Sequence, residues 1–453
     1  MGKLETMFDD IPEIITPPVN MNEVNEAINI HEGGFQLKFD EKEINLNGII
    51  QFHWFPSLGV NFLGIVQDVA YQEILILTQT LEKCDLVIDG LSCGQALITG
   101  THITNSITLE GTMRFEAVRG DKTIPVTKVK FAIPNLKDFY GLPVKEVTQE
   151  GGVKFGKNRL KFENEDYIIV INQRSGYKDL KESLKSKGGY ITLYSGELTQ
   201  KKGSIKYEEI REVFLCFSNF LNFLNGRRCS PLFLQGVFDD EVIWCDYSSY
   251  FVDQYKPVSS WTPQHSIEGL NELWQAFSKM WKSEGDKDFL LSAIHWYTEA
   301  ISNSGFAEGA IIMAQTDLEL LYNWLLIEKK KLLIGKDAEN MSAANKIRLL
   351  LSQLNLNYDI PHAFTKLQLL PDVVDAPDAF VQIRNAIVHS QEEKRKKLKN
   401  LHYGVKYEAL KLGIWYIELS LLFILQYQGK YYNRCSGSLF AGSGEMLVPW
   451  AMH

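Results

Sequence analysis

The sequence lacks a long uninterrupted hydrophobic run. Its most hydrophobic stretch, residues 414–427, is shorter than the roughly 20 residues that an α-helix needs to span a bilayer, and it contains Glu418. The first residues, 1–6, show no apolar signal core. These absences exclude the common classes of helical membrane protein, and we expect a cytoplasmic protein that makes no contact with a membrane.

Paired cysteines and a phosphate-cradling loop are also missing. The Gly-x-x-x-x-Gly-Lys-Ser/Thr pattern does not occur, which argues against a P-loop nucleotide site. Single, scattered cysteines are typical of reduced thiols in a cytoplasmic chain, so we expect no disulfide framework, no metal site and no cofactor. None of the six cysteines stands in a Cys-x-x-Cys pair: Cys84, Cys93, Cys216, Cys229, Cys245 and Cys435.

The chain also lacks an excess of positive charge. Its 453 residues are enough for two or three domains, and the net charge is −9. Residues 266–453 carry 20 Lys and Arg against 21 Asp and Glu, whereas residues 1–265 carry 27 against 35. A nucleic-acid partner must therefore bind to local basic patches rather than to the field of the whole protein.

The first half of the chain is patterned like β-structure. Turn signals such as Asp89-Gly90 separate segments with a period of two or short buried runs, which predicts an antiparallel sandwich or barrel. We interpret the aromatic residues Trp54, Phe55 and Phe62 as core rather than as a ligand platform. The predicted strands include residues 35–39, 43–46, 74–77, 113–117, 129–133 and 167–171.

Helical spacing begins within this region and dominates the second half. Residues 207–225 carry one hydrophobic stripe that we expect to pack on the sheet. A Pro- and Ser-containing stretch, 256–263, marks the predicted domain boundary. We therefore predict an α+β protein with a β-rich domain over residues 1–262 and an all-α bundle over 263–453. Helices are expected near residues 267–283, 288–303, 307–333, 342–354, 377–397 and 405–428.

One segment, residues 379–390, combines a hydrophobic helix face with chemically useful side chains. Pro377 lies near its first turn, and Asp375 and Asp378 are available to cap its free amides. The spacing therefore predicts a well-defined helix start just ahead of the polar residues.

Three residues of this helix form the candidate site. Asn385 and His389 are four residues apart and share one face of a helix, where they can form a hydrogen bond. Arg384 lies about 140° away from His389 around an ideal helix. Two copies that cross antiparallel at a two-fold axis would bring both pairs to one cleft, so we expect a homodimer or a higher homo-oligomer.

The pattern Arg384-Asn385-x-x-x-His389 near the end of a hydrophobic helix resembles the signature of the HEPN superfamily of ribonucleases, and more narrowly its ApeA-like branch, which is linked to abortive defence against phage. Over roughly the last 190 residues the chain is similar to that domain, and the N-terminal part resembles the β-rich partner domain of the branch more loosely. The resemblance rests on three further segments: residues 293–300, 314–321 and 431–450.

This resemblance implies a metal-independent endoribonuclease that cleaves host RNA, with tRNA as the expected target. Histidine suits proton transfer near neutral pH, and the planar guanidinium of arginine meets two phosphate oxygens at once. His389 and Arg384 would take these roles, and Asn385 would orient the histidine ring or bind a phosphate oxygen. The products would be a 2′,3′-cyclic phosphate and a 5′-hydroxyl, and the N-terminal domain would restrain the nuclease or sense a phage-derived trigger.

Supporting residues are expected on either side of the motif. The resemblance implies that the acid at position 319, Glu319, orients Arg384. A carboxylate that is simply solvated is an equally good interpretation of this residue. A basic run just after the motif would grip phosphates that flank the cleavage site, or form a solvated helix face. That predicted RNA-binding run includes Lys394, Arg395, Lys396 and Lys397.

Two alternatives remain open from the sequence. Asp372, Asp375 and Asp378 are spaced by three, which on a continuous helix would present carboxylates to a divalent ion, but Pro371 and Pro377 favour capping and loop roles. The second alternative is a non-catalytic RNA- or nucleotide-binding adaptor of the same helical architecture.

Overall fold

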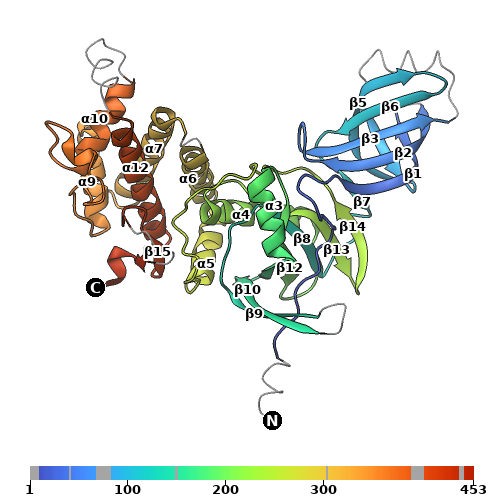
Figure 1. Cartoon of the computed structure of the whole chain (residues 1–453), viewed down its shortest axis with the longest axis horizontal. Coiled ribbons are helices and arrows are strands. Elements are labelled where there is room, and N and C mark those ends of the chain that lie inside the picture. The colour runs from blue at the N-terminus through green and yellow to red at the C-terminus, as the bar shows by residue number, and fades with distance from the viewer. Residues whose placement is uncertain are drawn as a thin grey trace. The chain divides into compact units, whose positions relative to one another are not determined.

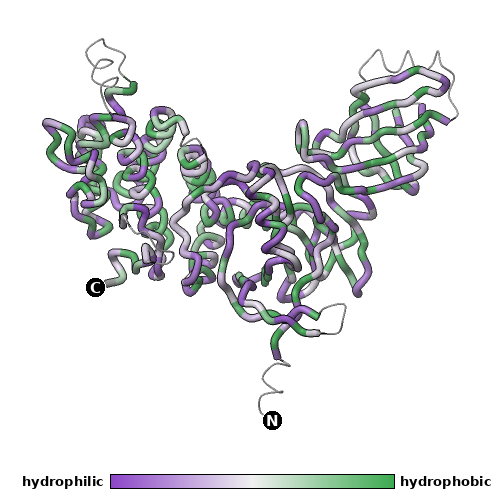
Figure 2. The backbone as a smooth tube through the Cα atoms, in the orientation of Figure 1, coloured by the Kyte–Doolittle hydropathy of each residue, from purple (hydrophilic) through white to green (hydrophobic). Residues whose placement is uncertain are grey.

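The computed structural model describes two compact units of an α+β protein, a β-rich region followed by helices, as the sequence predicts (Figure 1). The β unit comprises Met1–Lys137, Gly141–Leu215 and Cys229–Lys256, and the helical unit comprises Asp138–Tyr140, Cys216–Arg228 and Pro257–His453. Hydrophobic and hydrophilic residues are interspersed along the backbone of both (Figure 2). The structure describes residues 10–39, 42–67, 83–147, 152–302, 305–388, 402–437 and 443–452.

The β unit begins with a closed antiparallel barrel in which the strand order is β1-β2-β3-β6-β5-β4. Alternation places Phe35 and Leu37 of β1 in the core, and Asp89-Gly90, with φ of 52° and 80°, forms the predicted turn before β5. The strands are β1 (Ile28–Lys38), β2 (Glu43–His53), β3 (Gly59–Val66), β4 (Lys83–Ile88), β5 (Leu91–Ile103) and β6 (Ile107–Met113).

Two expectations for this region need correction. The predicted strand over 113–117 is wrong, because β6 ends at Met113 and the side chain of Phe115 is 71% exposed. Trp54 and Phe62 are core residues as interpreted, but Phe55 is exposed and covers Tyr190 from outside. The predicted strand at 74–77 lies outside the described residues.

The second sheet of the β unit is open and has the order β7-β14-β13-β8-β12-β11-β10-β9, with antiparallel pairs throughout. Helix α3 (Tyr177–Lys187), which the sequence patterns did not predict, connects β11 to β12. The strands are β7 (Val118–Gly120), β8 (Lys128–Pro134), β9 (Leu142–Val147), β10 (Val153–Glu163), β11 (Tyr167–Gln173), β12 (Thr192–Gln200), β13 (Leu232–Phe238) and β14 (Glu241–Asp246).

Helix α4 (Tyr207–Asn225) has the predicted bounds, and Gly226 with a φ of 70° ends it. We expected its hydrophobic stripe to pack on the sheet alone, but the stripe also packs within the helical unit. Phe214 packs edge-on against Phe131 of β8 in the β unit, with ring centroids 5.0 Å apart. The second half of the helix belongs to the helical unit, where Phe220 packs on Trp274 at 5.3 Å.

The helical unit contains long helices close to the predicted ranges, with a π-helical segment, η1, directly after α7. None of the described helices is long and apolar enough to cross a membrane. The elements are α5 (Leu270–Trp281), α6 (Glu284–Ser302), α7 (Ala307–Tyr322), η1 (Asn323–Lys329), α8 (Lys336–Asn340), α9 (Ala343–Gln353), η2 (Leu367–Leu369), α10 (Ala376–Val388), α12 (Tyr403–Ile424), β15 (Lys430–Tyr432), β16 (Glu445–Leu447) and η3 (Pro449–Met452).

Three helices meet where α10 enters the core of this unit. A Cβ atom at Gly413 of α12 would come within 2.6 Å of the ring of Phe380 on α10 and within 3.4 Å of Cβ of Ala314 on α7. Glycine is therefore needed at this contact because any side chain would push α10 away. This close packing positions the polar end of α10 against α7.

Candidate functional site

The start of α10 is fixed by the capping residues that the sequence predicts. The backbone N–H of Asp378 donates to Oδ1 of Asp375 at 2.9 Å, and the N–H of Val374 donates to Oδ2 of Asp378 at 3.1 Å. Asp375 also binds Arg348 of α9 in a bidentate pair, with N–O distances of 2.6 and 2.9 Å. These contacts set where α10 begins and tie it to α9.

The same contacts argue against the alternative in which the acids near the start of α10 bind a divalent metal ion. Asp375 is committed to Arg348 and to the helix cap, and Asp378 accepts a further hydrogen bond from Gln382 at 2.9 Å. Among the described residues no group of three or more His, Cys, Asp or Glu side chains could hold a metal ion. The interpretation of Asp375 and Asp378 as helix caps is confirmed.

Arg384 lies two turns further along α10, where its guanidinium is partly buried. Its side chain is 28% exposed; Nη1 donates to Oδ1 of Asn385 at 3.1 Å, and Nη2 lies 3.8 Å from Oε1 of Glu319 on α7. Its Nε is sealed from solvent without a hydrogen-bond partner among the described residues. The structure thus brings Arg384, Asn385 and Glu319 into one cluster.

Two residues that sequence reasoning did not single out complete this cluster. Gln315 donates from Nε2 to Oε1 of Glu319 at 3.1 Å, one helical turn away on α7. Burial raises the pKa of Tyr322; the carboxylate of Glu319 raises it further, and Arg384 lowers it in part. The spacings of four and three residues from Glu319 were the available signal, since such residues share one helix face.

The other predicted site residues fall elsewhere in the chain. His389 and the basic residues Lys394, Arg395, Lys396 and Lys397 lie outside the described residues, so their predicted roles stay predictions. Arg384 and Asn385 lie four and three residues before Val388, the last described residue of α10.

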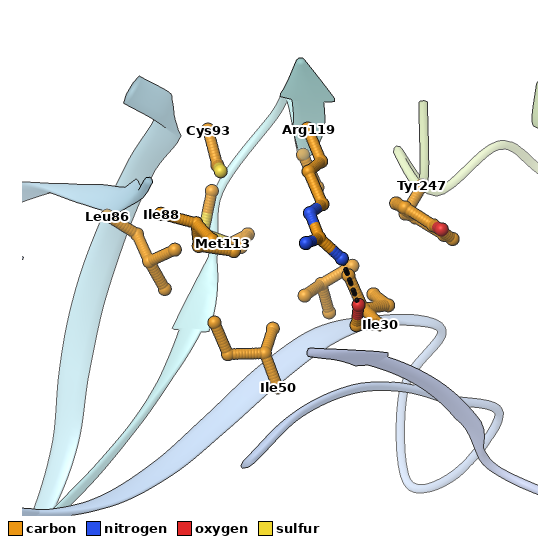
Figure 3. Close-up of a pocket in the computed structure, with 10 residues that line it drawn as sticks. Ile30, Ile50, Leu86, Ile88, Cys93, Met113, Arg119 and Tyr247 are labelled. Atoms are coloured by element: carbon orange, nitrogen blue, oxygen red, sulfur yellow. Dashed lines mark hydrogen bonds between the residues drawn. The ribbon is translucent and has the colours of Figure 1, made fainter. Parts of the chain in front are cut away.

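The barrel of the β unit contains a small apolar cavity that is not a substrate site. Arg119 is one of the lining residues and donates from Nη1 to the carbonyl of Ile30 at 3.0 Å (Figure 3). The cavity volume of about 10 Å³ is that of a single water molecule, and its walls are hydrophobic. Burial raises the pKa of the Cys93 thiol in this wall to about 11, so this thiol is not an activated nucleophile.

Comparison with known proteins finds one family model in each unit, and both models describe domains of YopA. Residues 121–258 match the family model described as the YopA central domain, and residues 283–445 match the YopA C-terminal domain. No solved structure matches the chain. The chain is similar along nearly its whole length to the SPbeta prophage-derived uncharacterized protein YopA of Bacillus subtilis (strain 168), with 27% identity over 443 residues that cover 94% of this chain and 96% of that protein.

Proposed function

We propose that the helical unit is a metal-independent endoribonuclease of the HEPN type, similar to the ApeA-like branch. The observation that carries the proposal is the cluster on α10 and α7, in which Glu319 and Asn385 hold a partly exposed guanidinium next to the end of the motif helix. An arginine held in this way is preorganised to bind a phosphate, since its planar fork can meet two oxygens at once.

The reaction uses the nucleophile that RNA itself carries. The ribose 2′-oxygen attacks the adjacent phosphorus while a base removes its proton, and the bond from phosphorus to the 5′-oxygen breaks as that oxygen takes up a proton. We assign His389 to proton transfer and Arg384 to the negative charge on the phosphorane. The products are a 2′,3′-cyclic phosphate and a 5′-hydroxyl, and the steps balance without a metal ion.

The proposed site is shared between two copies of the chain. Arg384 and His389 point in directions about 140° apart on an ideal helix, so one copy does not aim both at the same phosphate. Two motif helices related by a two-fold axis would supply a base and an acid from different copies. A strictly monomeric protein that is fully active in light-scattering and cleavage experiments would contradict this arrangement.

The proposed physiological role is abortive defence against phage in the cytoplasm, where cleavage of host tRNA halts growth. The β unit would restrain the nuclease or sense a phage-derived trigger. The prophage origin of the similar Bacillus protein is consistent with a role in competition between phages. Lys394, Arg395, Lys396 and Lys397 would bind phosphates that flank the cleavage site.

The test is cleavage of total RNA and purified tRNA by the wild type and by Arg384→Ala and His389→Ala, with and without EDTA. We expect EDTA-resistant cleavage by the wild type, 2′,3′-cyclic phosphate ends, and a loss of at least about 100-fold in both variants. His362→Ala is the matched control, since this exposed histidine lies outside the cluster. The assay is run with and without phage lysate, so that nuclease activity that requires a phage-derived trigger is also detected.

The alternative is an RNA- or nucleotide-binding adaptor without catalysis. One observation favours it: Arg384 already has an acidic neighbour, as a purely structural arginine would. Under this alternative tRNA binds, no cleavage appears under any of these conditions, and overexpression of the wild type and of His389→Ala has the same effect on growth.

A further inference from the structure

The β unit contains a second, larger cavity, of about 470 Å³, beside the start of α3. One wall is the N-terminal segment, residues 14–22. This segment is tied to the sheet, because the N–H of Ile15 donates to Oδ1 of Asn172 at 2.9 Å and Gln235 donates to the carbonyl of Pro18 at 3.0 Å. The cavity is therefore formed by anchored chain, and its volume is in the range of small-molecule sites.

Arg174, just ahead of α3, lines this cavity and is the residue that needs an explanation. Only 8% of its surface is exposed. Its Nη1 atom donates to the carbonyls of Met21 and Thr192, at 3.0 and 3.1 Å, and to Oγ1 of Thr192 at 2.5 Å. One end of the guanidinium is thus fully used and fixed in place.

In the described part of the chain, the charge of Arg174 interacts with the carboxylate of Glu26 but forms no close ion pair. No acidic group of the described residues lies within ion-pair distance of it, although buried charges in proteins are normally paired. Burial lowers the pKa of Arg174, and the more distant Glu26 opposes this effect only in part. A buried and unpaired guanidinium costs stability, and a bound anion would remove this cost.

The remaining edge of the guanidinium is available to that anion. Nε and Nη2 make no hydrogen bond within the described part of the chain, and neither is among the atoms sealed from solvent, while Arg174 lines the cavity. The two N–H groups of this edge are parallel, which is the geometry that binds two oxygens of one phosphate or carboxylate.

The start of α3 adds a second source of positive potential. Gly176, with a φ of 70°, is the N-cap, and no side chain caps the first amides of this 11-residue helix. The helix dipole favours an anion at such a terminus. Asp179 in the first turn is an acidic residue of the cavity wall, and Ser175, also in the wall, donates its hydroxyl to Glu146.

We propose that this cavity binds a small molecule through a phosphate or carboxylate group, held by the Nε–Nη2 edge of Arg174 beside the N-terminus of α3. The hydrophobic side chains of Ile14, Ile15 and Leu180 would cover the uncharged part of the ligand. The site lies entirely within the β unit and does not depend on the proposed nuclease activity.

The experiment is titration calorimetry of the full-length chain with inorganic phosphate, AMP and citrate. Binding of phosphate and AMP without citrate identifies a phosphate site, and the reverse identifies a carboxylate site. We expect AMP to bind more tightly than inorganic phosphate, because it also contacts the hydrophobic walls. Arg174→Gln should weaken the binding by at least about 10-fold, the equivalent of one charged hydrogen bond.

A pair of surface variants keeps the test independent of folding. Ser175→Asp places a carboxylate at the mouth of the cavity and should abolish binding, whereas Ser186→Asp adds the same charge at the far end of α3 and should leave it unchanged. Asp179→Asn should tighten the binding. The proposal is overturned if none of the three anions binds at about 10 mM, or if Ser175→Asp and Ser186→Asp bind equally well.

Discussion

Arg384 and Glu319 join α10 to α7 through an ion pair of 3.8 Å. Because the Glu319 side chain is 45% exposed, water screens the pair, and its contribution to stability is below about 1 kcal/mol. The main effect of Glu319 is therefore on the charge that Arg384 presents. A phosphate that approaches Arg384 meets a guanidinium already held by one carboxylate.

Removal of that carboxylate should strengthen RNA binding. We expect Glu319→Gln to lower the Kd for tRNA about threefold to fivefold at low salt, because the repulsion between Glu319 and phosphate is lost, with little change in Tm. Fluorescence anisotropy with labelled tRNA measures this in a His389→Ala background, which prevents cleavage. The gain should shrink at high salt, since salt screens exposed charges.

Glu328→Gln is the control for net charge, because Glu328 is exposed and lies on η1, outside the cluster. Equal effects of the two substitutions would mean that tRNA responds only to the overall charge of the helical unit. In that case Arg384 does not contact phosphate, and the assignment of Arg384 to the reaction fails.

A second ion pair holds the end of the chain in the helical unit. Arg434 donates from Nε to Oε2 of Glu418 at 2.7 Å and from Nη2 to Oε1, and both side chains are buried. Burial alone would lower the pKa of Arg434, but Glu418 outweighs it and the pKa is raised. Tyr297 donates its hydroxyl to Glu418 at 3.0 Å, so the carboxylate is well satisfied.

Breaking this pair should strongly destabilise the helical unit. Glu418→Ala leaves the Arg434 charge buried and unpaired, which costs about 3–5 kcal/mol of unfolding free energy. The double variant Glu418→Leu, Arg434→Met should recover most of the loss. Urea denaturation measures both. The control is Glu299→Ala, which breaks the ion pair of Glu299 with Arg228, a pair more exposed than that of Glu418 with Arg434, and it should cost about 1 kcal/mol or less.

The bidentate contact between Asp375 and Arg348 positions α10 and can be tested separately from its cap. Asp375→Asn keeps a capping oxygen but loses the ion pair, so we expect a loss of about 1–2 kcal/mol. Asp375→Ala should lose about 1 kcal/mol more, since the cap is also removed. Asp372→Asn, at an exposed acid three residues earlier, should change the unfolding free energy by less than about 0.5 kcal/mol.

Local patterns predicted the parts of the fold that local chemistry determines. The hydrophobic stripe of residues 207–225, the acids before α10 and the alternation at Phe35 and Leu37 were all readable because neighbours within one element decide them. The end of β6 at Met113 was not, because the chain beyond it shows a strand-like period while Phe115 lies in solvent. Only the tertiary arrangement separates these cases.

Some features of the candidate site were likewise predictable from the sequence, and others depend on tertiary packing. The Arg-Asn spacing and the acid at Glu319 were visible in the sequence, but the 3.8 Å contact between Arg384 and Glu319 depends on how α10 packs on α7. Arg174 gave no signal at all. Its importance comes from burial without a close ion pair, and its guanidinium is held by the N-terminal segment and β12.

Asp317 is the clearest feature that the sequence concealed, and it predicts an unusual dependence of stability on pH. Its carboxyl is fully buried on α7, and neither oxygen has a hydrogen-bond partner within the described part of the chain. Burial raises the pKa of Asp317 well above its usual 3.8. The folded state therefore keeps a proton that the unfolded chain releases, and the stability contributed by this proton is lost as pH rises from about 4 toward the folded-state pKa.

Asp317→Asn cannot ionise and should escape that loss. Its Tm should be close to that of the wild type at pH 4, and its advantage in unfolding free energy should grow by about 1.4 kcal/mol for each pH unit above this, until the folded-state pKa is reached. Thermal unfolding from pH 4 to pH 8 measures the difference, with Asp288→Asn on the exposed face of α6 as the control. An advantage that does not vary with pH would show that the carboxyl ionises inside the fold, and that Asp317 has a partner beyond the described residues.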